Sequence, residues 1–135
     1  MESLYYILAF VLGLIADVVV HYLKKVIDRI LEVKETKRQR KDDLVRWLFS
    51  MYSSWKTMRD LSGTVDVVSD IVNYVKEANG YLAGFLVYAG MREKRICWEI
   101  QRLLGELGKV VLSKPLDKNK VDEIMEDIYK TAEKL

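Results

Sequence analysis

Residues 4–23 read LYYILAFVLGLIADVVVHYL, a run of twenty in which Asp17 is the only acidic and His21 the only basic residue. A helix rises about 1.5 Å per residue, so this run makes a rod of roughly 30 Å, the thickness of one bilayer hydrocarbon core. The run predicts a helix that lies in an apolar environment, either a bilayer or a partner's hydrophobic surface. Its predicted membrane or subunit contacts are Leu4, Tyr5, Ile7, Leu8, Phe10, Val11, Leu14, Ile15, Val18 and Val19.

The residues around this run do not have the pattern of a secretory signal peptide. Met1-Glu2-Ser3 places no basic residue before the run, and no small-x-small cleavage site follows it. A signal peptide has a basic start and a cleavage site of that kind. We therefore expect the run to stay attached to the mature protein.

Asp17 and His21 are spaced four residues apart, so both side chains lie on one face of the expected helix. A carboxylate near the centre of a bilayer costs about 2.5 to 3.5 kcal/mol on insertion scales, so we expect Asp17 to face protein, water or His21 rather than lipid. Two interpretations stay open, a polar seam that locks the helix onto a neighbour and a proton or ion relay. We favour the seam, because the chain offers no second hydrophobic span to build a pathway.

Beyond Leu23 the apolar residues recur with a period of 3.6 and charged residues take the opposite face. We expect one unbroken first helix from about Ser3 to Lys41, apolar nearly all round in its first half and amphipathic in its second. Every Lys and Arg in residues 1–41 follows Leu23. The predicted headgroup or phosphate contacts are Lys24, Lys25, Arg29, Lys37, Arg38, Arg40 and Lys41.

The position of these basic residues also predicts an orientation. They follow the hydrophobic run and none precedes it, so the positive-inside rule places the amino end outside the cell and the rest of the chain in the cytoplasm. A simpler interpretation stays open, in which the basic residues only keep an amphipathic helix soluble.

Residues 42–135 predict a compact bundle of four helices after the 1–41 segment. Asp42 or Asp43 is a plausible N-cap for the first of them, with Gly63 as its end and Thr64 as the N-cap of the next. The apolar residues of the first recur at steps of three and four, and those of the second lie on one side of the helix. They are Leu44, Leu48, Met51, Trp55 and Met58, followed by Val65, Val68, Ile71, Val72 and Val75.

Asn79-Gly80 is a turn signal, and the apolar pattern beyond it predicts one long helix from Tyr81 to about Leu112. Pro115 then marks a break, after which Asp117 can cap a final helix. The expected fold is therefore all-α, with a long N-terminal hydrophobic helix leading into a compact four-helix bundle.

The side chains needed for metal binding or covalent catalysis are scarce in this sequence. Cys97 and His21 are its single cysteine and single histidine and lie far apart, so neither a zinc set nor a nucleophile–histidine pair is supported. The glycines form no phosphate-binding string. Carboxylate pairs such as Glu123 and Asp127 alternate with lysines and fit a solvated face. We expect no enzyme, no metal, no cofactor and no small-molecule substrate, with Cys97 as a buried packing residue.

Two short basic clusters, residues 37–41 and 92–95, raise the question of nucleic-acid binding. Both clusters are interrupted, and the net charge of the chain is only +2, so one chain does not assemble a long phosphate footprint. We expect nucleic-acid contact only in an assembly, where repeated copies could form a basic lining.

The leading hypothesis is a non-enzymatic, self-assembling structural protein of the coat, shell or scaffold type. The chain has more apolar surface than four short helices can hide, so the N-terminal helix would insert in a membrane or pack with sister copies in a homo-oligomer. In architecture alone, a small helical bundle with an apolar first helix resembles some coat proteins of archaeal viruses. The low Asn and Gln content beside abundant Lys and Glu is typical of thermophilic proteins. The protein would then be membrane-associated or part of a virion.

The alternative hypothesis is a single-pass, membrane-anchored protein whose cytosolic bundle docks a partner or acts as a regulator. In that case the part of the chain after about Asp42 should fold as a soluble monomer, and only the full chain should partition into membranes.

Overall fold

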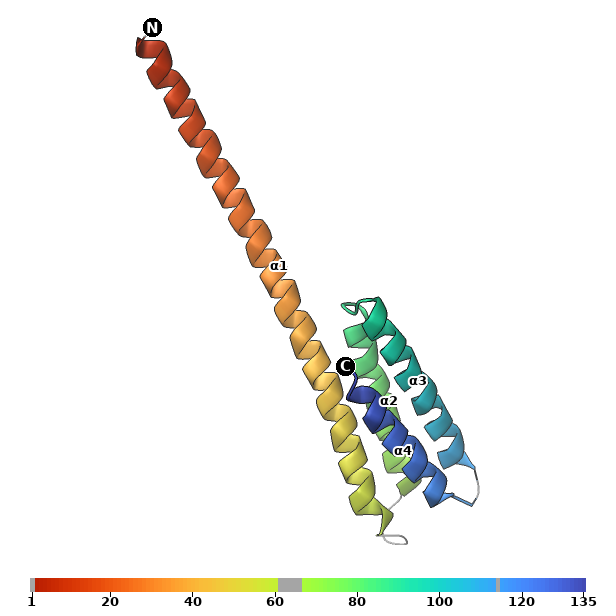
Figure 1. The fold of residues 1–135 in the computed structure, drawn as a ribbon. Coiled ribbons are helices and arrows are strands. Elements are labelled where there is room, and N and C mark those ends of the chain that lie inside the picture. Colours follow the sequence, from red (N-terminus) through yellow and green to blue (C-terminus); the bar gives the residue numbers. More distant parts are fainter. Residues whose placement is uncertain (1, 61–66, 114) are drawn as a thin grey trace. The chain divides into compact units, whose positions relative to one another are not determined.

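The computed structural model describes residues 2–60, 67–113 and 115–135, and every regular element in these ranges is a helix. α1 spans Glu2–Arg59, α2 Val67–Leu86, α3 Met91–Leu112 and α4 Lys118–Ala132 (Figure 1). This arrangement confirms the predicted all-α class, with a long apolar first helix followed by helices that pack together.

The chain divides into two compact units, Met1–Thr36 and Lys37–Leu135. α1 contributes its first part to one unit and its last part to the other. The second unit is a four-helix bundle formed by the last part of α1 with α2, α3 and α4. Its core consists of apolar side chains that are at most 5% exposed, which include Leu44, Leu48, Met51, Ile71, Leu82, Phe85, Ile100, Leu104, Leu107, Val121, Met125 and Ile128.

Aromatic side chains connect α1 to its two neighbours in the bundle. The indole Nε1 of Trp47 donates to the carbonyl of Tyr74 in α2 at 3.3 Å, and the two rings lie 5.9 Å apart. On the other side the rings of Tyr52 and Tyr129 in α4 stack with centroids 4.9 Å apart. Such ring pairs stabilise packing beyond the area they bury. These aromatics are therefore packing residues at the edge of the core.

The expected helix start at Asp42 or Asp43 is wrong, because α1 continues without a break to Arg59. Neither glycine nor proline lies between Leu23 and Asp43, and the segment is rich in Lys, Arg, Gln and Glu, which are good helix formers. Both aspartates are exposed, so their carboxylates stay in water. The predicted core stripe Leu44, Leu48, Met51 and Trp55 is nevertheless confirmed, since all four are buried in the last part of α1.

The turn expected at Asn79-Gly80 is also wrong, because α2 runs through it to Leu86. Ala78, Leu82 and Phe85 are all buried on one face, so burial on both sides of the turn signal keeps the helix intact. The break instead lies at residues 87–90, where the Tyr88 amide donates to the Phe85 carbonyl at 2.9 Å. The single long helix expected for residues 81–112 is thus the end of α2 followed by α3.

The last helix begins where the sequence predicts. Asp117 is the N-cap of α4, and its carboxylate accepts a hydrogen bond from the Lys120 amide at 3.2 Å. This confirms the capping role of Asp117 after the break at Pro115. The caps expected at Gly63 and Thr64, with Val65 beside them, lie outside the described residues.

A polar cluster fastens the end of α1 to the start of α4. Trp55 is only 1% exposed, and its indole Nε1 donates to Oδ1 of Asp122 at 2.6 Å. The guanidinium of Arg59 contacts the other carboxylate oxygen of Asp122 at 2.5 Å. The ammonium of Lys118 donates to the Arg59 carbonyl at 3.1 Å. Trp55 is thus buried with its donor satisfied, which a buried indole requires.

Cys97 is fully buried in α3, which confirms its expected role in packing. Burial raises the pKa of its thiol to about 11, and the negative charge of Glu93 adds to this effect. The thiol therefore stays protonated at neutral pH and is a poor nucleophile.

Candidate functional site

The predicted contact residues of the hydrophobic run all lie on the surface of the first unit. Leu4, Tyr5, Ile7, Leu8, Phe10, Val11, Leu14, Ile15, Val18 and Val19 have exposed fractions between 44% and 73%. Similarly exposed are their neighbours Tyr6, Leu12, Val20 and Tyr22, which are not among the predicted contacts. They belong to the same run, so the apolar surface surrounds the helix on all sides.

The first part of α1 is long and apolar enough to cross a membrane. Its most apolar stretch has a mean hydropathy of 2.2 and none of that stretch is buried. At roughly 25 cal/mol per Å² of apolar surface, leaving so many large side chains in water is costly. Monomeric soluble proteins rarely expose a continuous apolar surface of this extent. The surface is therefore the feature of the chain that most needs a partner.

Asp17 and His21 lie one turn apart within this apolar surface, and both are exposed. Gly13 lies one turn before Asp17, and a Cβ built there would meet nothing within 4 Å. This face therefore has a glycine without a side chain next to two polar side chains. Small and polar residues of this kind suit a close contact between two helices. The arrangement is compatible with the polar seam and with the relay.

Past the hydrophobic run, the first unit has an apolar stripe on one face only. Val19, Leu23, Val26, Ile30 and Val33 follow one another at steps of four, three, four and three residues. Their exposed fractions lie between 37% and 51%. Lys25, Asp28 and Glu32 occupy the opposite face of the same turns. Alternating steps of three and four are the spacing with which two helices pack along a shared seam.

The structure divides the predicted headgroup contacts between the two units. Lys24, Lys25 and Arg29 belong to the first unit, while Lys37, Arg38, Arg40 and Lys41 belong to the second. In the second unit, the ammonium of Lys37 forms an ion pair with Oε1 of Glu93 at 2.6 Å, which ties α1 to α3. Lys37 is therefore paired within the second unit.

The environment of Glu93 at the start of α3 is strongly basic. Burial raises the pKa of this carboxyl, but the hydrogen bonds from Lys37 and from the Gly90 amide outweigh that effect. The positive charges of Lys37 and Lys41 act in the same direction, so the pKa of Glu93 is held below its usual value. Glu93 is thus ionised at neutral pH and attracts the basic residues Lys37 and Lys41 of α1 to the start of α3. No sequence signal links these distant positions.

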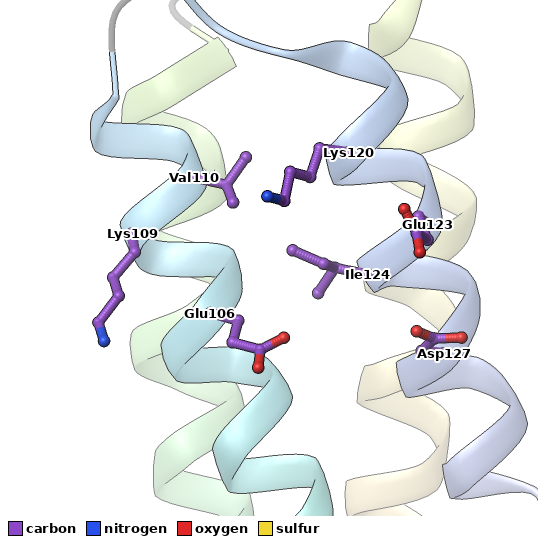
Figure 2. Close-up of a pocket in the computed structure, with 7 residues that line it drawn as sticks. All are labelled: Glu106, Lys109, Val110, Lys120, Glu123, Ile124 and Asp127. Carbon is purple, nitrogen blue, oxygen red and sulfur yellow. The ribbon is translucent and has the colours of Figure 1, made fainter.

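The groove between α3 and α4 is the other place where functional groups gather (Figure 2). It has a volume of about 360 Å³ and is lined by Glu106, Lys109, Val110, Lys120, Glu123, Ile124 and Asp127. Lys120 and Ile124 reach from α4 toward α3, whereas Lys109 points away. Arg102 holds Glu106 in an ion pair at 2.6 Å. The charged groups here are solvated and of mixed sign, as on an ordinary bundle surface.

Comparison with known proteins found no match to this chain among protein-family models, curated proteins or solved structures. Within residues 2–60, 67–113 and 115–135, no three His, Cys, Asp or Glu side chains are grouped so that they could hold a metal ion. The functional inference therefore rests on the apolar surface of the first unit and on the charges of the second.

Proposed function

We propose that this protein is a membrane-embedded, self-assembling structural protein without catalytic activity. Residues 4–23 cross a bilayer, and the stripe from Val19 to Val33 packs against the same stripe of sister subunits. The bundle of residues 37–135 is carried on the cytoplasmic side. The same arrangement would suit a cell membrane or the lipid layer of a virion.

The observation that carries this proposal is the contrast between the two units. The bundle has a core of its own, whereas the first unit is apolar and has no buried residue in its most hydrophobic stretch. Lipid is the environment in which an all-round apolar helix is stable, because the backbone hydrogen bonds of a helix are satisfied internally. The Lys24 and Lys25 ammonium groups follow the run directly, at the position of cytoplasmic headgroups.

The combined length of the hydrophobic run and the apolar stripe supports self-assembly. Residues 4–33 make about 45 Å of helix, whereas the hydrocarbon core is only about 30 Å thick. The end of the stripe, with Ile30 and Val33, therefore lies beyond the hydrocarbon. Charged side chains occupy its opposite face, so a sister helix with the same spacing is the simplest cover for it.

Disulfide cross-linking in membranes tests this assembly. Val26→Cys places a thiol in the stripe, and Asp28→Cys places one on the opposite face of the same turn. We expect mild oxidation to join full-length Val26→Cys chains into dimers and to leave Asp28→Cys chains mostly monomeric. Cys97 does not interfere, because it is fully buried.

A second candidate function is a monomeric, single-pass anchored protein whose cytosolic bundle docks a partner. The self-contained core of the bundle favours it. It is the better account if both cysteine variants cross-link equally weakly and light scattering in detergent gives the mass of one chain.

A further inference from the structure

The end of the bundle that carries the α2–α3 turn has exposed apolar side chains. Val87 is 79% exposed and Met91 is 67% exposed. The turn between them is held by the 2.9 Å hydrogen bond from Tyr88 to Phe85 and by a bond from the Gly90 amide to Oε1 of Glu93 at 3.3 Å. Both apolar side chains are therefore presented on an ordered turn, away from the core.

Basic side chains from α1, from α3 and from the segment that follows α4 gather at this end. The ion pair of Lys37 with Glu93 brings the cluster of residues 37–41 beside the start of α3. The guanidinium of Arg92 lies 3.5 Å from the Lys134 carbonyl, which adds the end of the chain to the same region. We call this region the basic end, and it comprises Val87 and Met91 with Lys37, Arg38, Arg40, Lys41, Arg92, Lys94, Arg95 and Lys134.

Acidic groups are present at the basic end but are fewer. Glu93 is engaged by Lys37, and the other acidic residues within residues 37–43, 87–95 and 133–135 are Asp42, Asp43 and Glu133. The side chains of the basic end thus carry an excess of positive charge around two exposed apolar groups. Figure 1 shows the α2–α3 turn and the carboxyl terminus toward the same end of the bundle.

We propose that the basic end docks on an anionic lipid surface, with Val87 and Met91 among the headgroups and the surrounding lysines and arginines on the phosphates. This combination of apolar and basic side chains is the one that peripheral segments use to bind anionic membranes. The inference rests on the proposed membrane anchoring and names the second contact that the protein makes with lipid.

Chain connectivity favours lipid over other anionic partners. The chain enters the bundle at Lys37, fourteen residues after Leu23, so the basic end is also the end at which the bundle is attached to the first unit. As helix, this connection is about 20 Å long. With residues 4–23 in the bilayer, this connection keeps the basic end within about 20 Å of the hydrocarbon edge, whereas a free protein or nucleic acid must come from solution.

A fluorescent probe on the turn tests the docking. Val87→Cys in the full chain is labelled with an environment-sensitive dye, and Leu112→Cys is the matched control, because Leu112 is 71% exposed at the opposite end of α3. Buried Cys97 stays unlabelled. Each protein is reconstituted in vesicles of phosphatidylcholine alone or mixed with phosphatidylglycerol, with brominated lipid as the quencher.

We expect brominated lipid to quench the Val87 probe in the anionic vesicles, and much less in neutral vesicles or at high salt. The Leu112 probe should be quenched in neither. Replacing both Arg92 and Arg95 with Gln should lower the ratio of docked to undocked bundle by roughly thirtyfold, because each basic side chain near the surface contributes to the attraction.

Three outcomes would overturn the docking. In the first, the Val87 probe is quenched no more than the Leu112 probe in anionic vesicles, although the chain resists extraction at alkaline pH. This result would contradict the docking but not the membrane anchoring. In the second, the Val87 probe is quenched equally in anionic and neutral vesicles, which would show that the contact does not depend on charge. A probe that responds only to added DNA or RNA assigns the basic end to nucleic acid instead. If alkaline washing releases the chain, the proposed anchoring fails as well.

Discussion

Residues 37–135, expressed without the first 36 residues, should fold as a soluble helical monomer, whereas the full chain should need lipid or detergent. The second unit contains the whole buried core, from Leu44 in α1 to Ala132 in α4. The exposed apolar side chains of residues 4–33 all belong to the first unit. Removing them should therefore improve solubility without loss of core packing.

Circular dichroism and light scattering of the two proteins check this expectation. The shorter chain should be strongly helical and of single-chain mass in buffer. The full chain should sediment or form large assemblies unless detergent is present. A shorter chain that aggregates or lacks helix would show that the first unit is part of the fold. A full chain that is monomeric in plain buffer would remove the need for lipid.

Replacing Trp55 with Ala should cost the bundle about 3 to 5 kcal/mol of unfolding free energy, the range typical for a buried tryptophan. Trp55 is 1% exposed, and its indole donates to Asp122, so the substitution leaves a cavity and one fewer partner for that carboxylate. Domains of this size are stable by only about 5 to 15 kcal/mol. The variant should therefore be close to unfolding at room temperature.

Urea unfolding of residues 37–135 measures this loss, with Trp98→Ala as the matched control. Trp98 is 54% exposed on α3, so its replacement should cost well under about 1 kcal/mol. Equal losses for the two tryptophans would contradict the placement of Trp55 in the core. If Trp55→Ala cannot be purified, Trp55→Phe fills more of the site and should show a smaller loss in the same direction.

Apolar periodicity predicted most of the core but not the ends of the helices. Leu44, Leu48, Met51 and Trp55 were predicted from their spacing, and burial confirms them. Asp42 was misread as a cap because aspartate also occurs within helices, where it simply faces water. The dipeptide Asn79-Gly80 was misread because a local turn preference is weaker than the burial of Ala78 and Leu82 on either side of it.

The two candidate surfaces differ in how far the sequence predicts them. The apolar run of residues 4–23 is continuous in the chain, so composition and length suffice to find it. The basic end is assembled from α1, the α2–α3 turn and the carboxyl terminus. Its defining contact, between Lys37 and Glu93, depends on how the helices pack, which no local pattern encodes. The exposure of Val87 likewise follows from a turn that the sequence did not indicate.

Proteolysis of the full chain in sealed vesicles tests the transmembrane placement of residues 4–23 most directly. A non-specific protease added on the side of the bundle should digest the exposed chain and leave a membrane-held fragment that contains Leu4 to Leu23, identified by mass spectrometry. The bilayer should protect this fragment until detergent is added. Complete digestion of residues 4–23 in intact vesicles would contradict the account.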